Sequence, residues 1–297
     1  MSKSSKNMTG IAIVILSSLC FAVVPTAAKI ALELGSSLFI LLFSRCMIGL
    51  LLLSPTLIFQ QDSVFLPKRF IRPILLSSLI SVSLIATTYH AIEFLDIAIV
   101  LIIMYSFPLG IAMLTHFRGE EELNFSQWVC LLTVIIGLII IISDGTFQGN
   151  SYGIGVSIIS LLLMTAFIYH SSKLVLNIGS LKFNFYMNLW SLLFLLIAYF
   201  LFDLSFSMPT TTAGRLALFF NGVFYILSYT LFFVGSKRIG ITRASVLAST
   251  EPLFASALAI VILQQFLTIL ECFGFFLVVI SLYLFEKSKS NQFSNPN

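Results

Sequence analysis

The chain alternates between long apolar stretches and short polar connections. Six stretches of about 20 residues contain no Asp, Glu, Lys or Arg: 7–28, 73–92, 97–117, 123–143, 183–202 and 216–236. A longer uncharged stretch covers 145–172, and three apolar stretches each contain one charged residue: 36–58, 244–264 and 266–285. Because a membrane-spanning helix needs about 20 mostly apolar residues, this pattern predicts ten spanning helices.

Composition supports a membrane protein and excludes a soluble one. Of 297 residues, 59% are apolar and only 9% are charged, whereas a soluble domain has roughly 25% charged residues. The mean hydropathy is +1.06. All four cysteines lie in apolar stretches without CxxC spacing, so we expect buried thiols and no metal site. The predicted fold class is therefore an all-α integral membrane protein.

The distribution of Lys and Arg predicts the orientation. With the N-terminus in the cytoplasm, the predicted inner segments hold Lys3, Lys6, Lys68, Arg69, Arg72, Arg118, Lys173, Lys182, Lys237, Arg238, Arg243, Lys287 and Lys289. The outer segments hold only Lys29 and Arg215, and Arg45 lies within a span. Cytoplasmic loops carry the excess of basic residues, so both termini are expected in the cytoplasm. The clusters are short, which argues against nucleic-acid binding.

The chain contains an internal repeat at an offset of 144 residues. The offset aligns Lys29–Ser36 with Lys173–Ser180, Phe39 with Phe183, Ile97 with Ile241, Pro108-Leu109 with Pro252-Leu253, and Leu123 with Leu267. We therefore expect two domains, residues 1–145 and 146–297, with five spans each. An odd number of spans places the halves in opposite orientations, so the repeats are inverted. Inverted repeats are typical of secondary transporters.

Two charged residues lie well inside predicted spans. Glu251 is eight residues past Arg243, about 12 Å along a helix, and Arg45 is about 13.5 Å into its span. Ionisable residues at such depth usually mark a pathway or an ion pair. Glu251 could carry a proton, attract a substrate ammonium group or pair with Arg45, or it could be a structural carboxyl. Arg45 could instead extend to the membrane surface or form a fixed ion pair.

Other polar residues in the spans are weaker candidates for a central cavity. The tyrosines are Tyr89, Tyr105, Tyr169, Tyr225 and Tyr229, and the histidines are His90 and His170. Tyr225 and Tyr229 are four residues apart and should share a helix face. Packing tyrosines and hydrogen-bonded structural histidines are the alternative. Pro108 and Pro252 occupy equivalent mid-span positions, where a kink or gate is expected, although proline is also common in spanning helices.

Motifs for chemistry are missing from the sequence. It contains no G-x-x-x-x-G-K-[ST] loop, no H-E-x-x-H and no G-x-S-x-G. The sequence therefore lacks the motifs typical of nucleotide hydrolysis, metalloproteases and hydrolases. We expect no enzyme activity, no cofactor and no metal.

Several motifs resemble the EamA family of the drug/metabolite transporter superfamily. Glu251-Pro252-Leu253-Phe254 resembles the Glu-Pro element of the second EamA repeat, and Arg118-Gly119-Glu120-Glu121 resembles the Gly-Glu connection before span five. Ser44-Arg45 resembles the arginine of span two. In the second half Gln264-Gln265 replaces the Gly-Glu pair, and Cys130 stands where the other half has Gly274.

This resemblance implies a transporter with a cavity between its halves, lined mainly by spans one, three, four, six, eight and nine. The expected function is secondary transport of a small polar or amphipathic metabolite by alternating access, with amino-acid-like compounds as leading candidates. Export is the expected direction. Import of a nutrient or cofactor-like metabolite, or a membrane receptor or scaffold, are the alternatives. The expected location is the bacterial cytoplasmic (inner) membrane, with protons as a candidate coupling ion and a monomer or homodimer.

Overall fold

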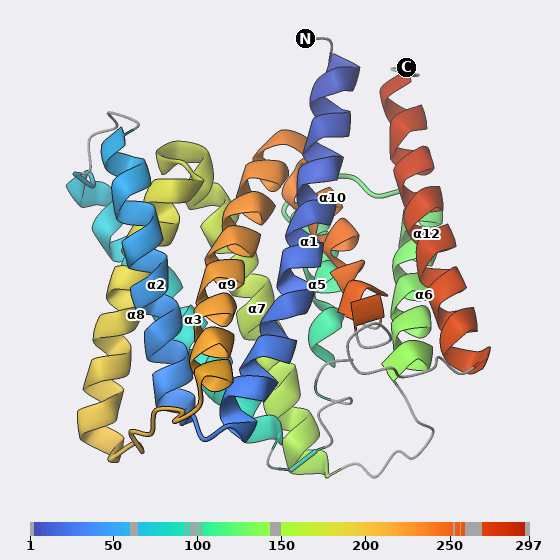
Figure 1. Ribbon diagram of the computed structural model, residues 1–297. Helices are drawn as coiled ribbons and strands as arrows, with labels where there is room; N and C mark the ends of the chain where they lie inside the picture. The colour runs from blue at the N-terminus through green and yellow to red at the C-terminus, as the bar shows by residue number, and fades with distance from the viewer. Residues whose placement is uncertain are drawn as a thin grey trace. The chain divides into compact units, whose positions relative to one another are not determined.

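The protein is built from α-helices and short connections, with no strand among the residues that the structure describes. The computed structural model describes residues 3–59, 65–92, 94–95, 100, 103–142, 150–251, 253–255, 257–258 and 269–294. Its helices are α1 (Lys3–Glu33), α2 (Leu38–Phe59), α3 (Lys68–Ile92), α5 (Phe107–Phe117), α6 (Phe125–Ile142), α7 (Ser151–Ile178), α8 (Ser180–Phe202), α9 (Thr212–Ile239), α10 (Ile241–Ala248) and α12 (Ile269–Ser294) (Figure 1).

Within the described ranges, six helices are long and apolar enough to cross a bilayer. They are Asn7–Glu33, Leu38–Ile58, Lys68–Ala91, Ser151–Ile178, Ser180–Phe202 and Thr212–Ile239. Shorter apolar helical segments cover Ile103–Phe117, Phe125–Gly137 and Phe276–Phe285. Large apolar side chains are exposed on these helices, among them Phe200 (79%) and Ile269 (92%). Lipid is the solvent that such surfaces require. The predicted all-α membrane fold is confirmed.

Two helix connections show the internal repeat directly in the backbone. Gly35 follows α1 and Gly179 follows α7, and these glycines are 144 residues apart. Both adopt positive φ, +93° and +81°, which costs a residue with a Cβ atom. The matching glycines therefore share a positive φ, one between α1 and α2 and the other between α7 and α8.

The helices form two compact units, and each unit draws on both halves of the sequence. Unit 1 comprises residues Met1–Val82 and His170–Arg238, and unit 2 comprises Ser83–Tyr169 and Ile239–Asn297. The compact units therefore do not follow the domain boundary expected between residues 145 and 146. That boundary concerns the repeat in sequence and stays a prediction.

Polar side chains connect the helices of unit 1. The Ser17 hydroxyl of α1 donates to the Ser228 carbonyl of α9 (2.8 Å). Asn184 of α8 donates from Nδ2 to the Thr230 hydroxyl of α9 (3.1 Å). Because apolar side chains gain little from leaving lipid for the protein interior, such hydrogen bonds and close packing hold spanning helices together.

Unit 2 combines a close helix pair with a polar link between two short helices. α6 packs along α12 (Figure 1), and Leu131, Val278 and Phe285 are fully buried in that core. α5 packs against α10, where the hydroxyls of Thr115 and Thr242 are hydrogen-bonded at 3.0 Å. α5 begins, and α10 ends, at an interruption of a predicted span.

Candidate functional site

The fourth and ninth predicted spans, residues 97–117 and 244–264, are both interrupted at equivalent positions of the repeat. We call them spans four and nine. Residues 103–105 are helical, Ser106 forms a turn, and α5 begins at Phe107. In the second half, α10 ends at Ala248, residues 249–250 form a turn, and the chain is helical again at Glu251. Ser106 and Thr250 are 144 residues apart.

The backbone hydrogen bonds at the two interruptions match. The amide of Ser106 donates to the Ile103 carbonyl (3.1 Å), and the amide of Thr250 donates to the Leu247 carbonyl (3.0 Å). Both bonds span three residues instead of the four of an α-helix, so each helix is tightened before it resumes. This shared geometry is a property of both halves.

Pro108 lies at the start of a helix rather than inside one. It occupies the first turn of α5, a position where a proline is tolerated because its missing N–H would have no partner anyway. The sequence suggested a kink in a continuous helix, whereas the structure has a break with the proline just after it. The second proline, Pro252, lies outside the described residues.

A hydrogen bond joins the two interruptions. Tyr105 precedes the break in span four, and its hydroxyl donates to Oε1 of Glu251, the first helical residue after the break in span nine (3.0 Å). Tyr105 and Glu251 are both partly buried. A carboxyl group at the start of a helical segment is also stabilised by the positive end of the helix dipole. Two candidates from the sequence, Tyr105 and Glu251, are thus brought together in unit 2.

Arg45 is held in unit 1 by neutral partners. Its Nε donates to Asn221 Oδ1 (3.2 Å), and its guanidinium carbon lies 4.3 Å from the ring centroid of Tyr225. Asn221 in turn donates from Nδ2 to the Val24 carbonyl of α1 (2.8 Å). The side chain of Arg45 is only 9% exposed. An amide and an aromatic face therefore stabilise a positive charge inside the span.

The two tyrosines of α9 share a face, as their spacing predicts. The rings of Tyr225 and Tyr229 contact edge to face with centroids 4.9 Å apart, and Phe21 of α1 packs on Tyr229 at 4.8 Å. Both tyrosines are buried. Arg45, Tyr225 and Tyr229 form one continuous cluster in unit 1.

The remaining candidates contact other residues. In unit 1, Nδ1 of His170 and the Ser77 hydroxyl are 2.8 Å apart. In unit 2, the Tyr169 hydroxyl donates to Glu120 and accepts from Arg118 Nη1 (3.3 Å).

Two candidates lie near the end of α3, in unit 2. Nε2 of the exposed His90 lies 3.2 Å from the Tyr152 hydroxyl. Tyr89 beside it is half-buried. The place of both residues in a central cavity stays a prediction.

Sequence reasoning missed the asparagines that organise unit 1. Asn221 holds Arg45, and Asn184 and Asn188 are fully buried on α8. Asn221 could have been identified from the sequence, because it lies four residues before Tyr225 and eight before Tyr229 and therefore shares their helix face. Among the described residues, no group of three or more His, Cys, Asp or Glu side chains could hold a metal ion.

Comparisons with known proteins agree with this architecture. The EamA-like transporter family matches residues 8–143 and 151–286. A chain described only as a crystal structure of a protein is similar over 95% of this chain and 97% of its own length, with a TM-score of 0.80 and 16% identity. At that identity the likeness concerns the fold alone. No curated protein gives a significant match. Because the two matched segments cover most of the chain, the protein belongs to the EamA-like transporter family, a family of membrane transporters and not of enzymes.

Proposed function

We propose that this protein is a secondary transporter that moves a small polar or amphipathic metabolite, with amino-acid-like compounds as the leading candidates, by alternating access. The observation that carries the proposal is the hydrogen bond between Tyr105 and Glu251, which links the interruptions of spans four and nine. Interrupted helices in both halves of a repeat are the usual place for substrate and ion sites in such transporters.

The interruptions give the two spans points at which their halves can turn. A residue at a helix break absorbs backbone rotation more easily than one inside a continuous helix. Glu251 and Tyr105 lie directly at these points. A ligand that replaces the Tyr105 hydroxyl as the partner of the Glu251 carboxyl group therefore binds at the points where the two spans bend at the lowest free-energy cost.

Glu251 supports two modes of coupling. In its ionised form it attracts the ammonium group of an amino-acid-like substrate, which replaces the Tyr105 hydroxyl as partner. In its protonated form it carries a proton in exchange for substrate. In both modes the partner of the carboxyl group, a substrate ammonium group or a proton, changes during the transport cycle. Because an unpaired charge inside a span costs free energy, this change of partner alters the relative stability of the transporter's conformations.

Sidedness and direction complete the proposal. The Lys and Arg distribution supports cytoplasmic termini in a bacterial inner membrane. Export is the leading direction and import of a nutrient or cofactor-like metabolite the alternative. Assembly is as a monomer or homodimer.

Proteoliposomes loaded with isotope-labelled proteinogenic amino acids test the function. We expect the wild-type protein to release at least one of them, and Glu251→Gln to slow that release by at least about tenfold, equivalent to about 1.4 kcal/mol in the barrier. Glu33→Gln is the matched control, because Glu33 is 63% exposed and pairs with Lys29 at a helix end.

Three outcomes contradict the proposal in different ways. An absence of flux for the amino acids and for a broad metabolite pool favours a receptor or scaffold. Retained transport in Glu251→Gln, with the same dependence on pH as the wild type, makes Glu251 a structural residue. Uptake that exceeds release under matched gradients favours import.

A further inference from the structure

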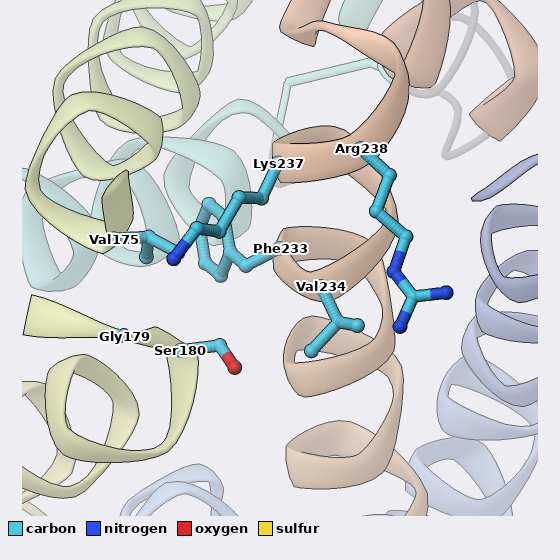
Figure 2. Close-up of a pocket in the computed structure, with 7 residues that line it drawn as sticks. All are labelled: Val175, Gly179, Ser180, Phe233, Val234, Lys237 and Arg238. Atoms are coloured by element: carbon cyan, nitrogen blue, oxygen red, sulfur yellow. The ribbon is translucent and has the colours of Figure 1, made fainter. Parts of the chain in front are cut away.

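Unit 1 contains a cavity where three helices meet near their ends. It has a volume of about 630 Å³ and lies at the end of α7, the start of α8 and the end of α9. Its lining residues are Val175, Gly179, Ser180, Phe233, Val234, Lys237 and Arg238 (Figure 2). A cavity of this size can hold a small ligand or a lipid headgroup. We call it the basic pocket.

The basic pocket has an apolar floor and a cationic rim. Val175 and Phe233 are buried, whereas Lys237 and Arg238 are exposed. Figure 2 shows Lys237 reaching from α9 toward α7, with the Ser180 hydroxyl turned into the same space and Arg238 extending along the other side of Val234. None of the seven lining residues is acidic. The pocket therefore presents two positive charges on its own residues.

The backbone at the start of α8 adds donors of the same polarity. α8 begins at Ser180 with no side-chain cap and no acidic residue in its first turn, so its first N–H groups and the positive end of its dipole remain uncompensated. The two cations, these N–H groups and the Ser180 hydroxyl together favour an anion.

We propose that the basic pocket binds the phosphate of an anionic phospholipid at the membrane surface. Lys237 extends over the cavity and neutralises the phosphodiester, and the Ser180 hydroxyl donates to one of its oxygens. Arg238 adds positive charge from the other side of Val234. The apolar floor accommodates the glycerol region, and Leu176, 56% exposed beside Val175, continues the apolar surface toward the acyl chains. Basic pockets between spanning helices are known to bind lipid headgroups. The charge pattern predicts that this surface faces the cytoplasm. The site is independent of the proposed transport function.

Native mass spectrometry of the delipidated full-length protein tests the site. Phosphatidylglycerol and phosphatidylcholine are titrated separately against wild type, Lys237→Gln/Arg238→Gln and Lys68→Gln/Arg72→Gln. The last variant is the matched control, because Lys68 and Arg72 are exposed, belong to the same unit and remove the same charge outside the pocket. We expect the pocket variant to weaken phosphatidylglycerol binding by about tenfold or more and the control to leave it unchanged. Ser180→Ala, which keeps both charges, should weaken it by about threefold.

The outcomes separate the sources of phosphate. Equal losses of phosphatidylglycerol affinity in the pocket variant and the control overturn the proposal, because they show that the lipid is attracted by the total positive charge and not by the basic pocket. Equal affinity for both lipids also overturns it. Inorganic phosphate that binds the wild type with the same dependence on Lys237, while phosphatidylglycerol does not bind, assigns the pocket to soluble phosphate and overturns the lipid assignment. Melting temperatures of all variants establish that each is folded.

Discussion

At the scale of single residues, Arg45 depends on neutral groups for its place inside a span. Its Nε bond to Asn221 and the ring of Tyr225 are the contacts that disperse its charge. A hydrogen bond to a charged group contributes more than one between neutral groups, and a buried donor left without a partner costs its desolvation. Asn221 is therefore central to the stability of unit 1, since it also reaches the backbone of α1 through Val24.

Asn221→Ala should lower the free energy of unfolding by about 2 kcal/mol, because it leaves the Arg45 guanidinium with one partner fewer in a low-dielectric surrounding. Equilibrium unfolding in mixed micelles measures the change. Asn177→Ala is the matched control, because Asn177 is exposed and donates to the Lys173 carbonyl of its own helix. A similar loss in both variants would show that Asn221 contributes no more than an ordinary surface asparagine.

The individual site residues were only partly predictable from sequence. Glu251 and Arg45 stand out because a single charge in an apolar stretch is conspicuous, and the shared face of Tyr225 and Tyr229 follows from helix geometry. Their partners could not be inferred in the same way. Asn221 is 176 residues from Arg45 and Tyr105 is 146 from Glu251, and a single sequence carries no information about such distant contacts.

At the scale of helices, the two interruptions are the main departure from the sequence prediction. Matching prolines at 108 and 252 indicated a weak point in spans four and nine, and the structure has one in each span. The position of the break was not predictable, because Ser106 and Thr250 end one helical segment two residues before the proline. Proline lacks the backbone N–H that would donate to the preceding turn, but this missing hydrogen bond does not by itself determine the residue at which the first helical segment ends.

Pro108→Ala should make span four more continuous and slow transport. Alanine restores an N–H group that can donate to the carbonyl of residue 104, so the break becomes less favourable and movement about it more costly. We expect transport in proteoliposomes to fall by about tenfold. The unfolding free energy should change by less than about 1 kcal/mol, because the restored hydrogen bond offsets the entropy that the unfolded chain gains without the proline.

Pro55→Ala is the control for Pro108→Ala, because Pro55 lies inside the continuous helix α2. Its transport rate should stay close to that of the wild type. Full activity of Pro108→Ala, or equal losses in the two proline variants, would remove the role assigned to the break. A large fall in stability would instead indicate that the proline is needed for packing.

At the scale of the whole molecule, the sequence predicted the all-α membrane fold and the two halves but not the compact units. Hydropathy and the repeat depend on residues close together in the chain or at one fixed offset, so both are visible in a single sequence. The packing of α2 along α8 and of α6 along α12 joins helices from different halves. This pairing depends on which helix faces pack together. The apolar pattern does not identify those faces, because most faces of these helices are apolar.

Membrane orientation is the whole-molecule prediction that remains to be measured. A half with five spans has its two ends on opposite sides of the membrane, and the excess of Lys and Arg predicts that both termini lie in the cytoplasm. An alkaline phosphatase fusion after Asp144 should therefore be active outside, and a fusion after Lys289 inactive. Fluorescent-protein fusions at the same sites should give the opposite pattern. If both readings reverse, the halves remain inverted but the assigned sidedness is wrong. A cytoplasmic reading at both sites would instead require an even number of spans in the first half, and inverted repeats with alternating access about the breaks in spans four and nine would then have no basis.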